Sequence, residues 1–152
     1  MIDRIYQLAT RLDGITEITE MLARATRSRS CGVLLQNRRT FVPVGGWFWG
    51  LDQIWVLSYR DHYCQCDPTV VEHFQIPPGT AYASHYDRDN PEFRESEFFT
   101  GWCTPQRLGY FAGAYLELEN DLSLRLTFQG DFDRGPYQAE ALRQMEAVLP
   151  HL

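Results

Sequence analysis

Residues 110–129, YFAGAYLELENDLSLRLTFQ, carry the most regular alternating pattern in the sequence. Two runs with an apolar side chain at every second position flank Asn120-Asp121, a turn-forming pair. Side chains of a β-strand point alternately to the two faces of a sheet, so the pattern predicts an antiparallel hairpin with one buried face. That face would carry Tyr110, Ala112, Ala114, Leu116, Leu118, Leu122, Leu124, Leu126 and Phe128.

A second, shorter hairpin is predicted earlier in the chain. Its strands would be 31–36 and 40–44, and Pro43 favours an edge position or a bulge because proline cannot donate to the ladder. The following segment, 45–50, reads GGWFWG. Its glycines would let the chain turn sharply, and its aromatic side chains would roof a pocket or fill the core.

Apolar residues at helical spacing occupy most of the remaining sequence. The expected helices cover residues 2–12, 15–25, 51–63, 69–74, 92–103 and the stretch from Pro136 onward. Residues 81–91 are polar and rich in turn formers, so we expect coil there. This order of elements predicts an α+β fold in which an antiparallel sheet is flanked by helices, an α-β-α sandwich of the GAF-like or PAS-like kind.

Length and composition restrict the function classes. A chain of 152 residues with 44% hydrophobic residues suits one globular domain. The net charge of −6 argues against nucleic-acid binding by the chain itself, and the absence of lysine excludes Schiff-base and phosphate-loop chemistry. No apolar run reaches the length of a membrane span, and we expect a cytoplasmic protein without disulfides.

The stretch 51–71, LDQIWVLSYRDHYCQCDPTVV, suggests a ligand pocket. One face of its predicted helix carries Trp55, Tyr59 and Tyr63, whose side chains have large apolar bodies with polar tips. Asp67-Pro68 then ends this segment and starts a second helix, which Asp67 can cap. A carboxylate beside an aromatic face suits a mostly apolar ligand with one polar head.

Several short motifs together resemble the ligand-binding domain of LuxR-type transcriptional regulators, and the resemblance covers nearly the whole chain. They are Trp55-x-x-x-Tyr59, Asp67-Pro68-Thr69-Val70, Ser96-Glu97-Phe98-Phe99-x-x-Trp102 followed by Pro105, and the ending from Gly135-Pro136-Tyr137 to Leu149-Pro150-His151-Leu152. In that family an N-terminal GAF-like or PAS-like domain senses a small molecule, and a C-terminal helix-turn-helix domain binds DNA.

The resemblance implies roles for individual residues. In the acyl-homoserine-lactone receptors of this family, the residue matching Trp55 donates its indole N–H to a ligand carbonyl, and the residue matching Asp67 accepts an amide N–H. The interval between these two residues is one residue shorter here, and Leu51 stands where those receptors have a tyrosine. These differences favour the broader LuxR-type branch over the lactone receptors. The expected ligand-binding residues are Trp55, Tyr59, Tyr63, Asp67, Thr69, Trp102 and Tyr110.

Two other kinds of site compete with this interpretation. Soft ligands such as His62, Cys64, Cys66 and His73 can bind zinc, but Cys-x-Cys lacks the usual two-residue gap and no second pair follows. We therefore expect no metal and no cofactor. The sequence contains no Gly-x-Ser-x-Gly elbow, dinucleotide glycine pattern or paired-carboxylate motif, so we expect no enzyme.

The favoured interpretation is a single ligand-sensing domain over residues 1–152. We expect a homodimer that contacts DNA only through a helix-turn-helix domain absent from this chain, and no contact with a membrane. A ligand-free dimerisation domain is the main alternative. The remote one is a small GAF-like enzyme that uses the thiol of Cys64, Cys66 or Cys103.

Overall fold

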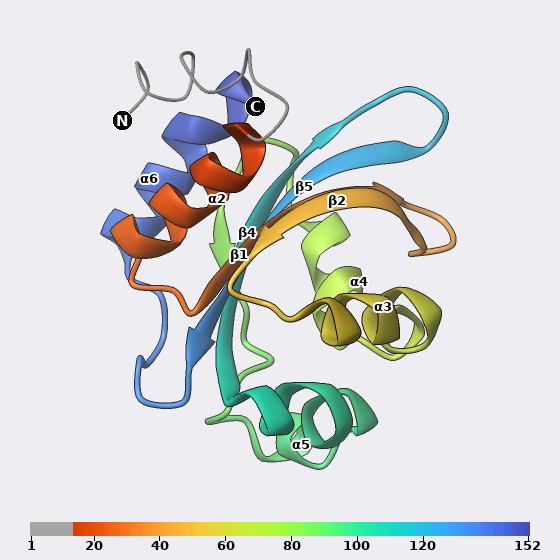
Figure 1. Ribbon diagram of the computed structural model, residues 1–152, viewed down its shortest axis with the longest axis vertical. Helices are drawn as coiled ribbons and strands as arrows, with labels where there is room; N and C mark the ends of the chain where they lie inside the picture. Colours follow the sequence, from red (N-terminus) through yellow and green to blue (C-terminus); the bar gives the residue numbers. More distant parts are fainter. Residues whose placement is uncertain (1–13) are drawn as a thin grey trace.

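The computed structural model describes residues 14–152, and the helix expected over 2–12 lies outside this range. Five antiparallel strands form one sheet in the order β2-β1-β5-β4-β3. Their bounds are β1 Ser30–Asn37, β2 Pro43–Trp49, β3 Tyr82–Ala83, β4 Leu108–Glu117 and β5 Leu122–Asp131. Helices lie on both sides of this sheet, which confirms the α+β, helix-flanked architecture (Figure 1).

The helices divide into two groups. One face of the sheet is covered by α2 (Gly14–Ala25) and α6 (Ala139–Val148), followed by the short η4 (Leu149–His151) (Figure 1). The other face and one end of the sheet carry α3 (Gln53–Asp61), η1 (Tyr63–Gln65), α4 (Pro68–Gln75), α5 (Pro91–Arg94), the π-helix η2 (Phe99–Cys103) and η3 (Thr104–Gln106). Among the described residues, none of these helices combines the length and hydropathy needed to cross a bilayer.

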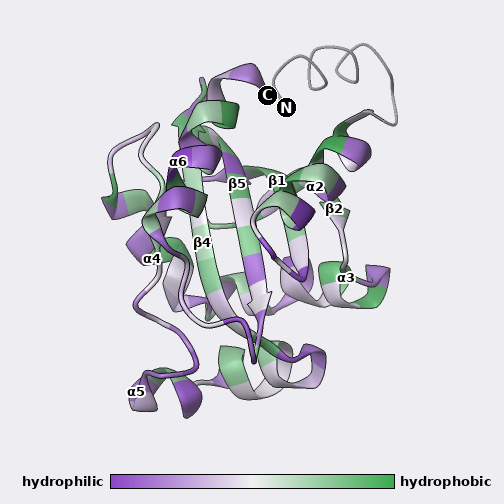
Figure 2. Ribbon diagram, turned by 90° about the vertical axis from the view of Figure 1, so that its left-hand side faces the viewer, coloured by the Kyte–Doolittle hydropathy of each residue, from purple (hydrophilic) through white to green (hydrophobic). Residues whose placement is uncertain are grey.

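The central hairpin forms as expected, but its burial differs from the prediction. Residues 108–115 of β4 and 125–130 of β5 are buried at successive positions, so both faces of the hairpin lie inside the molecule. The prediction of one buried face is wrong because α3, α4 and η2 cover the side that carries Arg125, Thr127 and Gln129. Figure 2 shows this mixed character, since β5 carries hydrophilic segments between hydrophobic ones.

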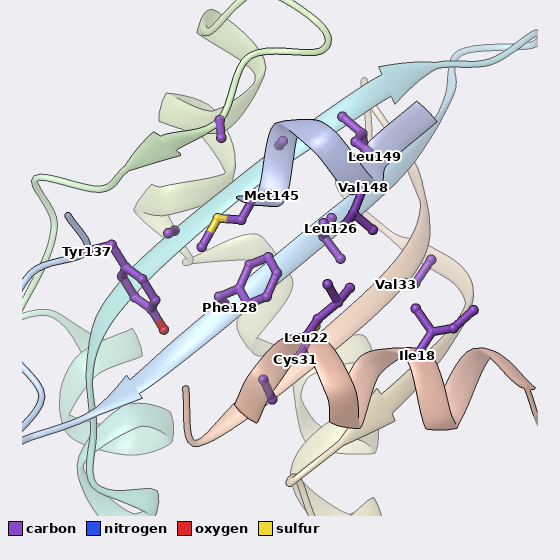
Figure 3. Close-up of a cluster of buried hydrophobic side chains, with 14 of the residues drawn as sticks. Ile18, Leu22, Cys31, Val33, Leu126, Phe128, Tyr137, Met145, Val148 and Leu149 are labelled. Atoms are coloured by element: carbon purple, nitrogen blue, oxygen red, sulfur yellow. The ribbon is translucent and has the colours of Figure 1, made fainter. Parts of the chain in front are cut away.

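The two faces of the sheet have separate cores. Figure 3 shows the first, in which Leu126 and Phe128 of β5 pack among side chains of α2 and α6 such as Leu22 and Met145. The second core, beneath the other helices, is rich in aromatic residues. Its buried members include Tyr59, Phe93, Phe98, Phe99, Trp102 and Phe111.

The first hairpin contains a correction. Pro43 is opposite Gln36, where the register shifts in an edge strand, so both the edge and the bulge predicted for it are confirmed. However, its second strand runs from Pro43 to Trp49, and Gly45-Gly46 belong to the strand rather than to a sharp turn. A Cβ on Gly46 would lie 3.0 Å from the Val33 carbonyl oxygen, which shows how closely the backbones approach there.

Two further segments differ from the sequence expectations. The helix expected over 92–103 is broken, because α5 ends at Arg94 and η2 begins at Phe99. Ser96 lies between them, where its hydroxyl donates to the Phe93 carbonyl and accepts from the Phe99 N–H. The coil expected over 81–91 includes the two-residue strand β3, which extends the sheet beside β4.

Candidate ligand-binding site

A small cavity lies between the sheet and the segment formed by α3 and α4, where the aromatic spacing predicts one. Its volume is about 50 Å³. The lining residues are Leu34, Phe48, Leu51, Val56, Tyr59, Asp67, Thr69, Tyr82, Phe98, Trp102, Phe111, Ala112, Arg125, Thr127, Phe128 and Gln129. The wall is therefore mostly aromatic and aliphatic, with a few polar groups gathered at one end, as is common in small-molecule sites.

Four of the seven expected ligand-binding residues line this cavity: Tyr59, Asp67, Thr69 and Trp102. Trp55 and Tyr63 do not, although both pack against the same aromatic core. The Trp102 indole N–H donates to the Trp55 carbonyl over 2.9 Å, so it is already bonded within the protein. Val56, one position beyond Trp55, reaches the cavity instead.

Tyr110 lies on the opposite face of the sheet. It belongs to the core beneath α2 and α6, and its hydroxyl donates to Asp89 Oδ1 over 3.1 Å. The physical reason is strand alternation: Phe111, the next residue, faces the cavity, so Tyr110 must point away from it.

Asp67 organises the polar end of the cavity. Its Oδ1 atom accepts the Thr69 backbone N–H over 2.9 Å and the Thr69 hydroxyl over 2.6 Å. Its Oδ2 atom accepts the Tyr59 hydroxyl over 2.9 Å. Asp67 thus caps α4 as predicted, with Pro68 at the first helical position.

The charge state of Asp67 follows from these contacts. Burial raises the pKa of its carboxyl, whereas Arg125 and the hydrogen bonds from Thr69 and Tyr59 act in the opposite direction. All three of these hydrogen bonds are accepted by Asp67, which suits an ionised carboxylate because that group can only accept. Burial and the neighbouring Asp67 likewise raise the pKa of the Tyr59 phenol, so Tyr59 remains a donor.

Arg125 is the main site residue that sequence reasoning missed. It is buried on the cavity side of β5, where its Nη1 atom donates to Gln36 Oε1 over 3.1 Å. Its Nε atom has no hydrogen-bond partner among the described residues. Burial acts to lower the pKa of the guanidinium, but interactions with Tyr59, Tyr82 and Asp67 raise it overall, so Arg125 is a buried cation.

A signal for Arg125 was present in the hairpin register. Folding the chain at Asn120-Asp121 pairs Tyr115 with Arg125 and Phe111 with Gln129. The alternate face of the hairpin therefore carries aromatic side chains opposite its polar ones. A solvent face would not concentrate aromatic residues in this way, so the pairing indicates a covered polar surface.

Next to this polar end lies His73, which is buried in α4. Its Nδ1 atom is 3.1 Å from the Tyr82 hydroxyl, which donates to the Thr69 carbonyl over 3.2 Å. A hydroxyl has one proton, so Nδ1 of His73 must carry the proton that it shares with Tyr82. The His73 Nε2 atom is then a buried acceptor, and it has no partner in the described chain.

The cysteines provide no support for thiol catalysis. All four are free, and burial raises the pKa of the Cys31, Cys64, Cys66 and Cys103 thiols. Catalytic thiols require the opposite shift, because the thiolate is the nucleophile. Cys64 is also bonded within the protein, since its Sγ atom donates to the Arg60 carbonyl.

A wider groove of about 220 Å³ adjoins the cavity between β2 and α3. The two spaces share Leu34, Phe48, Val56 and Tyr59 as lining residues, so these side chains separate the inner cavity from the groove. The outer walls of the groove include Val44, Gly45 and Leu57. The polar inner end of the cavity and the apolar outer groove therefore lie next to each other, with these four side chains between them.

No protein-family model and no curated protein sequence matches this chain. Among solved structures, SdiA from Escherichia coli is similar with a TM-score of 0.62 and 16% identity, covering 99% of this chain and 58% of the SdiA chain. SdiA in complex with octanoyl-rac-glycerol has a TM-score of 0.67 and 14% identity, covering 97% of this chain and 60% of the other.

A GAF domain/HD domain protein from Geobacter sulfurreducens is also similar, with a TM-score of 0.58 and 14% identity. That match covers 93% of this chain and 92% of the Geobacter chain. At these identities the likenesses establish a GAF-like fold.

Proposed function

We propose that this chain is the small-molecule-sensing domain of a LuxR-type transcriptional regulator. The observation that carries the proposal is a cavity whose apolar walls converge on a polar end made by Asp67, Tyr59 and Arg125. The motif resemblance and the likeness to SdiA, which has been solved with octanoyl-rac-glycerol, support the same conclusion. Contact with DNA would be made by a helix-turn-helix domain outside these 152 residues, and the working unit would be a homodimer.

The polar end defines the head group of the ligand. The Asp67 carboxylate can only accept hydrogen bonds, and the unpaired Nε of Arg125 can only donate. A complementary head therefore carries at least one N–H or O–H and at least one oxygen acceptor, as amides and glycerol esters do. Because Trp55 does not line the cavity, Arg125 rather than an indole N–H is the proposed partner of the ligand oxygen.

The shape of the two spaces defines the rest of the ligand. The inner cavity of about 50 Å³ has room for a few atoms, whereas typical small-molecule sites have roughly 300–1,000 Å³. A ligand would therefore place its head in the cavity and its apolar part in the groove between β2 and α3. Passage between the two requires movement of Phe48 or Val56, which line both.

Native mass spectrometry of the protein purified from its own host tests the proposal, because it detects any bound small molecule by its mass. We expect a co-purifying small molecule with an apolar part and a head of the kind described. If the protein carries no small molecule and neither acylglycerols nor acyl amides bind to it, the proposal is wrong.

A matched pair of variants tests the site. Tyr59→Phe removes the hydroxyl that donates to Asp67, while Tyr63→Phe removes a hydroxyl outside the cavity lining. With octanoyl-rac-glycerol as the probe, calorimetry should show about tenfold weaker binding for Tyr59→Phe, because Asp67 loses the donor that positions its Oδ2 atom for the ligand head, and a loss of about 1.4 kcal/mol is tenfold in affinity. Tyr63→Phe should bind like wild type, and equal losses in both variants would contradict the site assignment.

One observation favours a dimerisation role as the second candidate. Some apolar side chains of β2 and α3 are exposed, including Val44 of the groove wall at 61% and Ile54 at 71% exposure. Such a surface is typical of an interface. Dimerisation would be favoured over sensing by two results together. Sedimentation should show a stable dimer that Ile54→Asp dissociates, and no ligand should be detectable.

A further inference from the structure

Three side chains of metal-binding type converge at the corner between α3 and α4. They are His62, Cys66 and Glu97, and one potential ligand atom from each lies within 4.8 Å of the other two. His62 Nε2 and Glu97 Oε1 are already in hydrogen-bonding contact. From the sequence, His62 and Cys66 were considered as zinc ligands together with Cys64 and His73 rather than with Glu97, and no metal was expected.

The local backbone explains this grouping. The turn of η1 is closed by hydrogen bonds from Gln65 N–H to the His62 carbonyl and from Cys66 N–H to the Tyr63 carbonyl, both 3.1 Å. His62 and Cys66 thereby lie at the two ends of one tight turn. Glu97 comes from the segment between α5 and η2, which is fixed by the Ser96 side chain.

We propose that His62, Cys66 and Glu97 bind one divalent transition-metal ion of the zinc class, with water as the fourth ligand. An imidazole nitrogen, a thiolate and a carboxylate oxygen are all ordinary zinc ligands, and three protein ligands plus water form an open tetrahedral site. Calcium and magnesium are disfavoured because they prefer oxygen ligands throughout.

Geometry and charge both suit such an ion. Zinc bonds of about 2.0–2.3 Å at tetrahedral angles separate ligand atoms by roughly 3.3–3.8 Å, so modest side-chain rotations complete the site. The side chains of His62 and Glu97 are 60% and 62% exposed, which leaves them free to rotate and admits the water ligand. The thiolate and the carboxylate balance the two positive charges, and the Cys66 thiol proton passes to solvent on binding.

The ion would connect two segments that wall the cavity. Cys66 precedes Asp67 and Glu97 precedes Phe98, and both following residues line the cavity. Coordination would therefore hold the α3–α4 corner against the segment between α5 and η2, and would stabilise the folded chain by mass action. The site itself does not depend on the proposed sensing function.

Cobalt(II) gives a direct test, because a cobalt–thiolate bond produces a charge-transfer absorption that nitrogen and oxygen ligands do not. The reduced, chelator-treated full chain should bind one equivalent of cobalt(II) with this absorption, and zinc(II) should displace it. Cys66→Ser should abolish the absorption, whereas Cys64→Ser, at the neighbouring thiol bonded to Arg60, should retain it.

The two exposed ligands keep the test decisive even if Cys66→Ser folds poorly. His62→Ala and Glu97→Gln alter solvent-exposed side chains, so the fold should remain intact. Each should weaken zinc binding by more than the roughly 10–100-fold that loss of a supporting contact costs. A wild-type chain without the charge-transfer absorption, an absorption that survives Cys66→Ser, or wild-type affinity in both exposed variants would each overturn the proposal.

Discussion

His73 is a buried residue whose two ring nitrogens have very different surroundings. Nδ1 contacts the Tyr82 hydroxyl, while Nε2 has no hydrogen-bond partner among residues 14–152. Burial, and secondly the positive charge of Arg125, hold the pKa of this imidazole well below its ordinary value. The folded protein therefore keeps His73 neutral over a range in which an unfolded chain would protonate it.

This difference predicts that the protein loses stability in mild acid. Below about pH 6.5, the ordinary pKa of histidine, the unfolded state binds one more proton than the folded state. The free energy of unfolding should therefore fall as pH decreases from about 6.5 towards the folded pKa, by at most about 1.4 kcal/mol per pH unit from this group. Urea denaturation across this pH range measures the free energy of unfolding. This free energy should depend less steeply on pH for His73→Gln than for wild type.

Nuclear magnetic resonance provides the independent check. The His73 ring should retain the shifts of a neutral imidazole at pH values where exposed histidines are already protonated. A His73 pKa at or above about 6.5 in the folded protein would contradict the prediction.

Residue-level features of the site differ in how far the sequence predicts them. Asp67 and Thr69 were predictable because capping depends on neighbours two residues apart, and Asp-Pro marks a helix start locally. Arg125 was missed because strand alternation alone tells which side chains share a face but not what covers that face, and only the aromatic residues paired with the polar ones across the hairpin indicate that the face is covered. Trp55 was misplaced for a related reason, since a helical face spans a broad arc and Val56 is the residue that reaches the cavity.

At the scale of elements, the pairing of β1 with β2 depends on a close approach of Phe48 to Gly32. A Cβ on Gly32 would lie 2.5 Å from Phe48 Cδ1 and 3.2 Å from Thr127 Oγ1. The Phe48 ring therefore occupies the space that a side chain at position 32 would need. This contact also places Phe48 between the cavity and the groove.

Gly32→Ala should consequently lower the free energy of unfolding by about 1–3 kcal/mol, the usual cost of overpacking. Gly45→Ala is the matched control, because a Cβ on Gly45 meets no atom within 4 Å. Chemical denaturation should show that Gly45→Ala leaves the free energy of unfolding nearly unchanged. In a protein that already carries Phe48→Ala, Gly32→Ala should lower the free energy of unfolding by clearly less than in wild type. An equal loss with and without Phe48→Ala would show that Phe48 is not the cause.

A second close approach in this hairpin helps to explain why β2 was mispredicted. Gly45-Gly46 in sequence are typical of a turn, because glycine removes the local preference for an extended strand. In the fold, only Gly46 of this pair is closely surrounded, by the Val33 carbonyl of the neighbouring strand and by the Phe48 ring of its own strand, whereas a Cβ on Gly45 would meet no atom within 4 Å. A non-local contact of this kind leaves no periodic signal in the sequence.

At the scale of the whole molecule, the two faces of the sheet serve different purposes. The face beneath α2 and α6 is tightly packed: Leu126 and Met145 are each 0% exposed (Figure 3). The opposite face contains the cavity, the adjoining groove and a buried cation. Sequence periodicity predicted the sandwich, since amphipathic helices and strands must bury their apolar sides, and the aromatic helical face within residues 51–63 predicted which layer would hold the cavity.

This asymmetry can be measured with one substitution made on each face. Leu126 of β5 lies in the closed core, whereas Leu34 of β1 borders both the cavity and the groove, and both side chains are buried. Leu126→Ala should lower the free energy of unfolding by about 3–5 kcal/mol, because it removes a full set of packing contacts and leaves a new void. Leu34→Ala should cost less, near the lower end of the range of roughly 2–5 kcal/mol, because part of its surface already faces free space.

The two variants should also differ in their response to a ligand. Leu34→Ala enlarges the passage between the cavity and the groove, so octanoyl-rac-glycerol should raise its melting temperature by more than that of wild type. Leu126→Ala leaves the cavity walls in place and should show the wild-type ligand-induced increase from a lower starting temperature. Equal destabilisation by both variants, with no difference in how the probe affects them, would mean that the face carrying Arg125 is as tightly packed as the closed one.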